Sequence, residues 1–167
     1  FHSRKFAVAS PKKRTVRTIP QTRTPMREQD PKQRAKNFTE VACGYSLEEA
    51  MRESERCLLC PDPACIEGCP VNIDICSFIR KIGEKDLRGA YDVISATNLL
   101  PAICGRVCPQ ESQCEEVCTV GETLEPVAIG RLERFVGDQA IAEGWASAPY
   151  VEANGFAPVL TEIGAAC

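Results

Sequence analysis

Cysteine constrains the fold of this chain more than any other residue type, because 11 of its 167 residues are cysteine. Eight of them fall into two closely spaced groups. The first group reads Cys57-x2-Cys60-x4-Cys65-x3-Cys69-Pro70, and the second reads Cys104-x3-Cys108-Pro109 followed by Cys114-x3-Cys118. Cysteine at this density indicates disulfides, zinc sites or iron–sulfur clusters.

A disulfide scaffold fits the sequence poorly. Secreted disulfide proteins are commonly short, carry a signal peptide and have an even number of cysteines. This chain has an odd number, and no apolar segment of the signal-peptide kind opens it. It also has no apolar run of the roughly 18 residues that a membrane span needs. We therefore expect metal ligation in the reducing cytoplasm, with no membrane span.

The spacing favours iron–sulfur clusters over zinc. Structural zinc sites usually contain repeated C-x2-C pairs, whereas only Cys57 and Cys60 form such a pair here. Thiolate sulfur is the soft donor that iron–sulfur clusters take, with four ligands per cluster. A Cys-Pro step after a ligand group is typical of ferredoxins, and both groups contain one, at Pro70 and Pro109. Eight cysteines would suffice for two 4Fe–4S clusters, with two four-cysteine zinc sites as the alternative.

Helical periodicity surrounds the first cysteine group. Ser46 and Glu49 form a capping box that predicts a helix ending at Cys57. Two further helices are predicted to open at Asp74 and at Asp86. These signals are local, so they fix where helices begin more firmly than how the helices pack.

The remaining pattern is also helical. We expect the second cysteine group to lie in a loop interrupted by Pro101 and Pro109. A last helix is predicted from Pro126 to about Ala142, because proline is tolerated in a first helical turn. No segment alternates between apolar and polar residues with a period of two. The sequence therefore predicts an all-α fold.

Glu133 is a candidate metal ligand within the last predicted helix. It shares a stripe with apolar residues from Ile129 to Ala140, and glycines lie three residues before it and four residues after it. A buried carboxylate is costly unless it is paired or bound to metal, and glycine lets the backbone approach a bulky group. A salt bridge to Arg131 or Arg134, or simple exposure, stays open as the alternative.

Charge divides the chain into a basic start and an acidic remainder. Residues 1–36 hold 11 Lys or Arg against 2 acidic residues, and residues 37–167 hold 9 against 21. We predict an extended basic arm over 1–36, a helical domain over 37–144 and a C-terminal tail over 145–167. The arm would bind an acidic partner or nucleic acid, or lie along its own acidic body. The lack of interleaved aromatic residues favours the last of these, with no nucleic-acid partner.

Several stretches of the sequence resemble one known family. They are Thr24-Pro25-Met26 through Asn37-Phe38, Glu55-Arg56-Cys57-Leu58-Leu59-Cys60, Gly68-Cys69-Pro70-Val71-Asn72-Ile73-Asp74-Ile75, Cys104-Gly105-Arg106-Val107-Cys108-Pro109 and Ala128-Ile129-Gly130-Arg131-Leu132-Glu133-Arg134-Phe135. The family is the N-terminal iron–sulfur domain of the glutamate synthase small subunit, of dihydropyrimidine dehydrogenase and of the large subunit of electron-bifurcating NADH-dependent ferredoxin:NADP oxidoreductase. The resemblance implies an α-helical ferredoxin-like fold stapled by two 4Fe–4S clusters.

The same resemblance implies ligands that cross between the two groups. Those implied for the first cluster are Cys57, Cys60, Cys65 and Cys118. Those implied for the second cluster are Cys69, Cys108, Cys114 and Glu133. Cys104 is the reserve for the fourth ligand of the second cluster. The resemblance implies no ligand role for three cysteines. We expect Cys76 to be a small core residue, and Cys43 and Cys167 to be free thiols.

The resemblance also implies a place in electron transfer. In the related enzymes this domain precedes a core that binds flavin and a nicotinamide nucleotide and opens with a G-x-G-x-x-G turn, a motif this sequence does not contain. We expect a subunit that is not catalytic alone and that relays single electrons to or from a flavin-containing NAD(P)H oxidoreductase. Flavin and NAD(P) would lie on that partner, and other iron–sulfur subunits are further candidate partners. The alternatives are a stand-alone ferredoxin-like carrier and a metal-stapled interaction module with no redox role.

Overall fold

A computed structural model of the chain describes residues 18–145. In this part, the secondary structure is helical apart from one isolated antiparallel bridge between Glu28 and Ala42. The elements are α1 (Pro31–Arg34), α2 (Leu47–Ser54), α3 (Ala64–Glu67), α4 (Ile75–Gly83), α5 (Leu87–Ser95), α6 (Pro101–Val107), the 3-10 helices η1 (Gln110–Ser112) and η2 (Thr119–Glu122), and α7 (Ile129–Ala142). The predicted all-α fold is confirmed. All of the predicted tail except its first residue, and Cys167 with it, lies outside the described residues.

The predicted capping box of α2 is present. The Ser46 hydroxyl accepts a hydrogen bond from the backbone N–H of Glu49, and the Glu49 carboxylate accepts one from the N–H of Ser46 at 2.7 Å. The helix ends at Ser54, earlier than predicted. The chain then tightens into i to i+3 hydrogen bonds, the last from the N–H of Cys57 to the carbonyl of Ser54. Cys57 therefore follows the helix in a turn instead of closing it.

The two predicted acidic caps are confirmed. Asp74 accepts a hydrogen bond from the N–H of Ser77 at 3.0 Å and opens α4. Asp86 accepts one from the N–H of Gly89 at 2.9 Å and opens α5. Each carboxylate satisfies a backbone donor that the first helical turn leaves without a partner.

Two further predicted boundaries are wrong. The second cysteine group does not lie wholly in a loop, because Pro101 opens α6 and Cys104 lies within that helix. Pro126 does not open the last helix, which begins at Ile129. The carbonyl of Pro126 accepts hydrogen bonds from the side chains of Arg23, at 2.7 Å, and Arg56, at 3.1 Å. These bonds use an acceptor that a helix starting at Pro126 would need for its own ladder.

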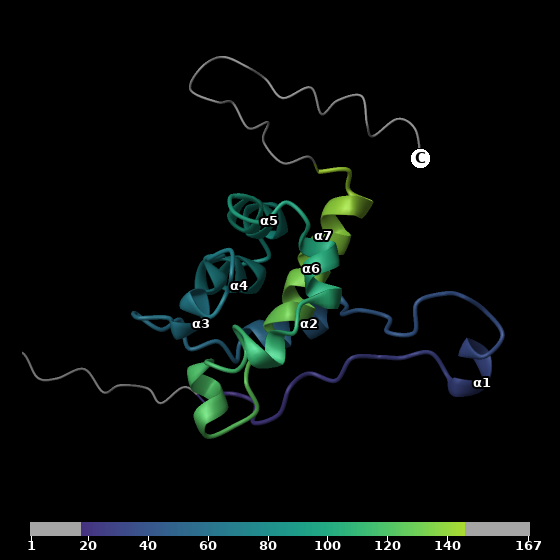
Figure 1. Cartoon of the computed structure of the whole chain (residues 1–167), viewed down its shortest axis with the longest axis horizontal. Helices are drawn as coiled ribbons and strands as arrows, with labels where there is room; N and C mark the ends of the chain where they lie inside the picture. Colours follow the sequence, from purple (N-terminus) through teal and green to yellow (C-terminus); the bar gives the residue numbers. More distant parts are fainter. Residues whose placement is uncertain (1–17, 146–167) are drawn as a thin grey trace, which may run out of the picture.

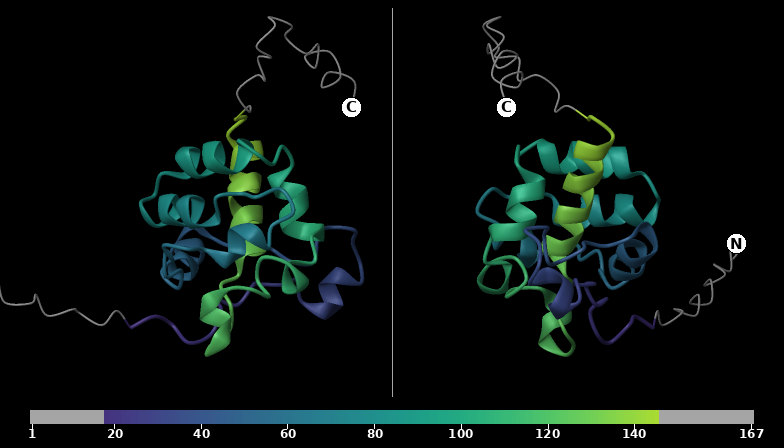
Figure 2. Two further views of the ribbon diagram at one scale, coloured as in Figure 1. Left: turned by 60° about the vertical axis from the view of Figure 1, so that its left-hand side comes forward. Right: turned by 90° about the vertical axis from the view of Figure 1, so that its right-hand side faces the viewer.

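Helix α7 runs through the middle of the domain (Figure 1). It packs along α6 on one side and against α5 and α2, while α4 packs against α5 and α2 (Figure 2). The most deeply buried apolar side chains of this core include Phe78, Ile79, Ile82, Ile94 and Leu132. The core therefore lies where α4, α5 and α7 meet. Among the described residues, no helix combines the length and the apolar character that a membrane crossing requires.

A fully buried ion pair anchors the start of the described chain. The Arg56 guanidinium lies 2.9 Å from the Glu53 carboxylate, and neither side chain is exposed. Arg56 also donates to the carbonyl of Pro20 at 3.0 Å. Glu53 accepts from the N–H groups of Thr24 and Ala128, at 2.6 and 2.9 Å. The pair thereby ties the N-terminal segment and the segment before α7 to the end of α2.

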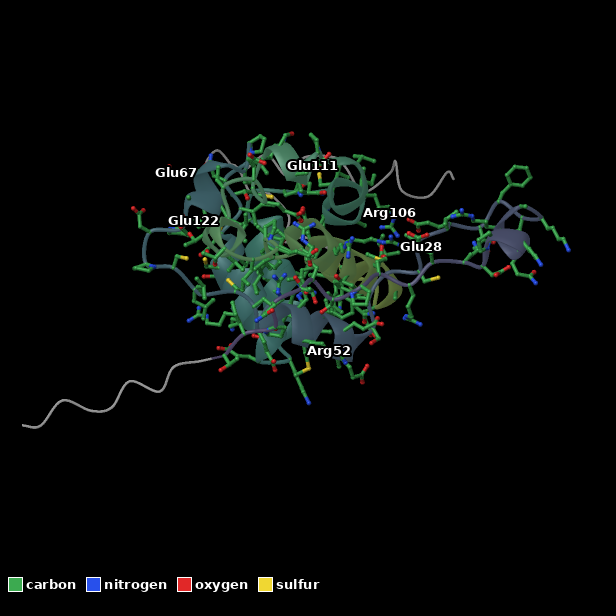
Figure 3. The ribbon with its side chains drawn as sticks, turned by 90° about the horizontal axis from the view of Figure 1, so that it is seen from below. Glu28, Arg52, Glu67, Arg106, Glu111 and Glu122 are labelled. Atoms are coloured by element: carbon green, nitrogen blue, oxygen red, sulfur yellow. The ribbon has the colours of Figure 1, made fainter. Side chains whose placement is uncertain are left out.

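The described part of the basic arm begins along the body and then leaves it. Arg23 forms an ion pair with Glu115 at 2.6 Å, and Arg27 forms one with Glu49 at 3.2 Å. Residues 28–42 then project outward with α1 near the tip, as seen from below in Figure 3, where the label of Glu28 marks the root of the projection. These ion pairs hold residues 23–27 against the acidic body, whereas residues 1–17 of the predicted arm lie outside the described residues.

Candidate metal centre

Every cysteine in the described part of the chain is a free thiol in the structure. Two neighbouring sites gather almost all of them. The first site is a cavity whose cysteines are Cys57, Cys60, Cys65, Cys76 and Cys118. The second site is a cluster of interacting side chains made of Cys69, Cys104, Cys108, Cys114 and Glu133. Exposed Cys43 belongs to neither site.

Turns and short helices position the thiols of the first site. Cys57 and Cys60 lie in the turn after α2, Cys65 lies in α3, and Cys118 directly precedes η2. Between the first two, Leu59 adopts a φ of 52°, in the left-handed region that leucine rarely enters. Backbone strain of this kind persists where the surrounding structure imposes it, and it is frequent at functional sites.

Apolar walls surround the first site. Among them are Ile75 and Ile79 of α4 and Val127 and Ile129 near the start of α7. Burial raises the pKa of Cys57 to about 12 and raises that of Cys65 well above its usual range. Such thiols stay protonated in the free chain, and binding to a metal removes their protons. The site therefore suits metal ligation better than reactivity as free thiolates.

Cys76 lies at the first site, although the sequence predicts only a small core residue. It packs against the edge of the apolar core, and it also lines the cavity with the other thiols. Its side chain interacts with those of Cys57 and Cys65. Cys76 occupies the first turn of α4, which faces the ligand loop, while the next turn of the helix packs into the core. Its spacing from the first group gave no signal of this placement.

Helices position most of the second site. Cys104 lies in α6, Cys108 caps the end of α6 and Glu133 lies on α7, while Cys69 and Cys114 come from the neighbouring loops. Burial raises the pKa of Cys108 to about 11 and that of Cys114 to about 12. The thiols and the carboxyl interact electrostatically, so they occupy one region of low polarity. Cys69 belongs to the first cysteine group in the sequence but lies at the second site. Cys118 belongs to the second group but lies at the first site.

Glu133 is buried, with 6% of its surface exposed. Its carboxylate accepts a hydrogen bond of 2.6 Å from the side-chain amide of Asn98. Burial is the main reason that its pKa rises to about 7, and the Asn98 hydrogen bond opposes that rise. A carboxylate in such apolar surroundings is costly to keep charged, so binding to a metal or protonation is favoured. Its surroundings are therefore those of a ligand more than of a surface acid.

The two alternatives for Glu133 do not hold. Exposure is excluded by its burial. The candidate salt-bridge partners have other contacts, since Arg134 pairs with Glu40 at 3.2 Å and Arg131 donates to the carbonyl of Thr24 at 3.2 Å. Sequence spacing alone placed both arginines beside Glu133, but on a helix adjacent residues point in different directions.

Asn98 links two groups of the second site, and the sequence gave no signal for it. It is 7% exposed and lies in the short connection between α5 and α6. Its amide nitrogen donates to Glu133, and its carbonyl oxygen accepts from the N–H of Leu100 at 3.0 Å and lies 3.6 Å from the Cys104 sulfur. Asn98 therefore orients the carboxylate and holds Cys104 next to it.

Helices α6 and α7 approach one another very closely at the second site. A Cβ added to Gly105 of α6 would lie 2.5 Å from the backbone nitrogen of Arg134, and one added to Gly137 would collide with the backbone of Ala102. A Cβ added to Gly130 would likewise collide with the Gln110 side chain. Glycine does allow the predicted close approach, but the group approached is another segment of the same chain and not a cofactor. This contact brings the cysteines of α6 next to Glu133.

The donors are of the kind that iron–sulfur clusters take. Within residues 18–145, no group of three or more His, Cys, Asp or Glu side chains is arranged to hold a single metal ion. The donors present, mostly thiols among apolar walls, match those that iron–sulfur clusters use.

Comparison with known proteins agrees with this chemistry. Residues 34–145 match the family described as dihydropyrimidine dehydrogenase domain II, 4Fe-4S cluster. The chain belongs to this family. The resemblance predicted from the sequence is therefore confirmed, and the helical structure is that of an iron–sulfur domain of the dihydropyrimidine dehydrogenase domain II family.

Curated relatives share this domain. The chain is 38% identical over 112 residues to the glutamate synthase [NADPH] small chain of Halomonas elongata, and 37% identical over 108 residues to that of Escherichia coli. It is 45% identical over 89 residues to the NAD-dependent dihydropyrimidine dehydrogenase subunit PreT of Escherichia coli. These alignments cover 67%, 65% and 53% of the chain but only 24%, 23% and 22% of the relatives. The chain thus spans about a quarter of their length.

Proposed function

We propose that this domain holds two 4Fe–4S clusters and relays single electrons to or from a flavin-containing NAD(P)H oxidoreductase. The observation that carries the proposal is the gathering of the thiols and one buried carboxyl into two neighbouring sites. Each site has at least the four donors that a cluster needs. Membership of a 4Fe–4S family supports the choice of metal.

The proposed ligands follow the two sites. Those of the first cluster are Cys57, Cys60, Cys65 and Cys118, and those of the second are Cys69, Cys108, Cys114 and Glu133. This crossed arrangement is supported by the placement of Cys69 with the second site and of Cys118 with the first. Cys104 remains the reserve for the fourth position of the second cluster, because it lies next to Asn98 and Cys108.

The arrangement suits electron transfer between the two clusters. Cys65 of the first site lies in α3, and Cys69 of the second site follows two residues after that helix ends. A short stretch of backbone therefore connects the two sites. Each cluster, when bound, exchanges one electron at a time. The domain's own part is to hold the two sites close together, keep them among apolar walls and give them different donors.

The first site lies near the surface. Leu58 lines its cavity and is 49% exposed, and the adjacent Leu59 is 41% exposed. Exposed apolar side chains around a redox site are typical of a surface where a partner docks. Three acidic side chains, Glu67, Glu111 and Glu122, lie on one side of the domain in Figure 3. A partner that presents apolar and basic side chains would complement these two features.

The partner is inferred from the relatives. Their names specify NADPH or NAD, and the domain matches less than a quarter of the length of each. We place binding of the nicotinamide nucleotide, and of the flavin that the proposal requires, in a part of such proteins outside this match. The domain would exchange electrons with that part and need not react with the substrate itself.

A reductive titration of the iron-loaded protein without air tests the proposed function. Two one-electron clusters predict uptake of about two electrons per chain, with an EPR signal that appears on reduction. Complete loading with metal but no electron uptake would contradict the proposal. It would instead support a metal-stapled module that only binds partners.

A further inference from the structure

The first site contains one thiol more than a four-iron cluster needs. Its cavity is lined by five cysteines, while a cluster takes four ligands. We infer that Cys76 is a reserve ligand of the first cluster, which binds iron when Cys60 releases it. This inference rests on the proposed function, because it presumes that a cluster occupies the first site.

The position of Cys76 carries the inference. It lines the same cavity as the four proposed ligands. Its thiol lies near those of Cys57, Cys60 and Cys65, close enough for each to influence its pKa. No other thiol outside the proposed set reaches this cavity among the described residues. Cys76 is thus central to the group although the ligand spacing does not include it.

The two exchanging residues differ in how firmly they are held. Cys76 lies in α4, which is capped by Asp74 and anchored by the fully buried Phe78 and Ile79. Cys60 lies in an irregular turn beside exposed Leu59, with a weak contact of 3.7 Å from its sulfur to the Thr119 hydroxyl. A ligand on a partly exposed turn leaves an iron more readily than one fixed on a packed helix.

The exchange conserves charge and electrons. With a cluster held at the first site, the Cys76 sulfur would replace the Cys60 sulfur on the same iron, so one iron–sulfur bond would break and one would form. The proton of the Cys76 thiol would pass to the departing Cys60 thiolate, directly or through water. No oxidant or reductant would be consumed, and four cysteine thiolates would hold the cluster before and after the exchange.

Metal content of ligand variants tests this inference. The full chain, purified without air, is compared as Cys60→Ala, as Cys60→Ala with Cys76→Ala, and as Cys60→Ala with Cys43→Ala, the last being a matched control that removes an exposed thiol outside both sites. We expect Cys60→Ala and the control to keep about eight iron per chain with a changed EPR signal, and the Cys76 double variant to keep about four. A fall to about four iron in Cys60→Ala itself would overturn the inference.

A second measurement leaves all four proposed ligands of the first cluster in place. Cys76→Ala alone should load fully and then lose the iron of its first site to a chelator several-fold faster than the unchanged chain. Equal rates would overturn the reserve role, and so would failure of Cys76→Ala to load the first site, because Cys76 would then be a primary ligand. A wild-type chain that binds no cluster at the first site would instead contradict the proposed function.

Discussion

The two sites of this domain differ in the side chains that form them. The first site gathers thiols among apolar walls and is held by turns and short helices. The second site adds a buried carboxyl with an amide partner and is held where α6 meets α7. A carboxylate is a harder and less electron-donating ligand than thiolate. On the proposed assignment of ligands, this one difference in donors would give the two clusters different reduction potentials.

The largest effect should come from a change that affects both sites alike. Arg56→Ala leaves the fully buried Glu53 without its cation and releases the segments that the pair ties together. Breaking a buried ion pair typically costs about 3–5 kcal/mol. We expect loss of unfolding free energy of this size in urea titrations, with iron lost from both sites. Arg52→Ala, at an exposed position of α2 four residues earlier, is the control, and equal stability of the two variants would contradict this account.

The next effect should separate the sites. Glu133→Ala removes the proposed fourth ligand of the second cluster, so about four of eight iron atoms should be lost, while the EPR signal of the first cluster survives. Glu143→Ala, just after the same helix, is the control and should keep all the iron. If iron content and the EPR spectrum of Glu133→Ala are unchanged, the assignment is wrong. Cys104→Ala then tests the reserve ligand.

A smaller effect is expected at the contact of α6 with α7. Gly105→Ala places a methyl group against the α7 backbone at Arg134. Overpacking of this kind costs about 1–3 kcal/mol, and here it should push Cys104 and Cys108 away from Glu133. Thermal unfolding should show the loss, and the spectrum of the second cluster should change more than that of the first. Gly83→Ala, whose added Cβ would meet only the Ser54 hydroxyl at 3.3 Å, is the control.

The smallest effect concerns the pH at which the second site loads. Because the pKa of Glu133 rises to about 7 in the free chain, its carboxyl is protonated below that pH and iron must displace the proton. Reconstitution of the second site should therefore weaken as pH falls through 7. Glu133→Gln offers an oxygen that carries no such proton, so its loading should fall less steeply, since the thiol protons are common to both proteins. The same fall in both proteins would contradict the role of the carboxylate.

Sequence predicted what local chemistry decides. The caps at Ser46, Asp74 and Asp86 were found because a capping side chain bonds only to its own helix. The cysteine groups were found because their spacing is short and their chemistry is specific. Helical periodicity made Glu133 a candidate ligand but left a salt bridge or exposure open, and only its surroundings in the structure exclude both.

Tertiary contacts account for what sequence could not predict. Cys76 joins the first site because α4 packs beside the turn that carries Cys57 and Cys60. Asn98 became part of the second site because α5 and α6 direct their connection toward Glu133. Helix α7 begins at Ile129 and not at Pro126, because the carbonyl of Pro126 accepts hydrogen bonds from the distant Arg23 and Arg56. Each of these depends on residues far apart in the chain, which no local pattern specifies.

The most direct test of the central claim counts iron, acid-labile sulfide and zinc per chain in protein purified without air. Two 4Fe–4S clusters predict about eight iron and eight sulfide, with no stoichiometric zinc. About four iron and four sulfide would mean that only one of the two sites holds a cluster. Stoichiometric zinc with little iron would contradict the account, and the two sites would then be structural.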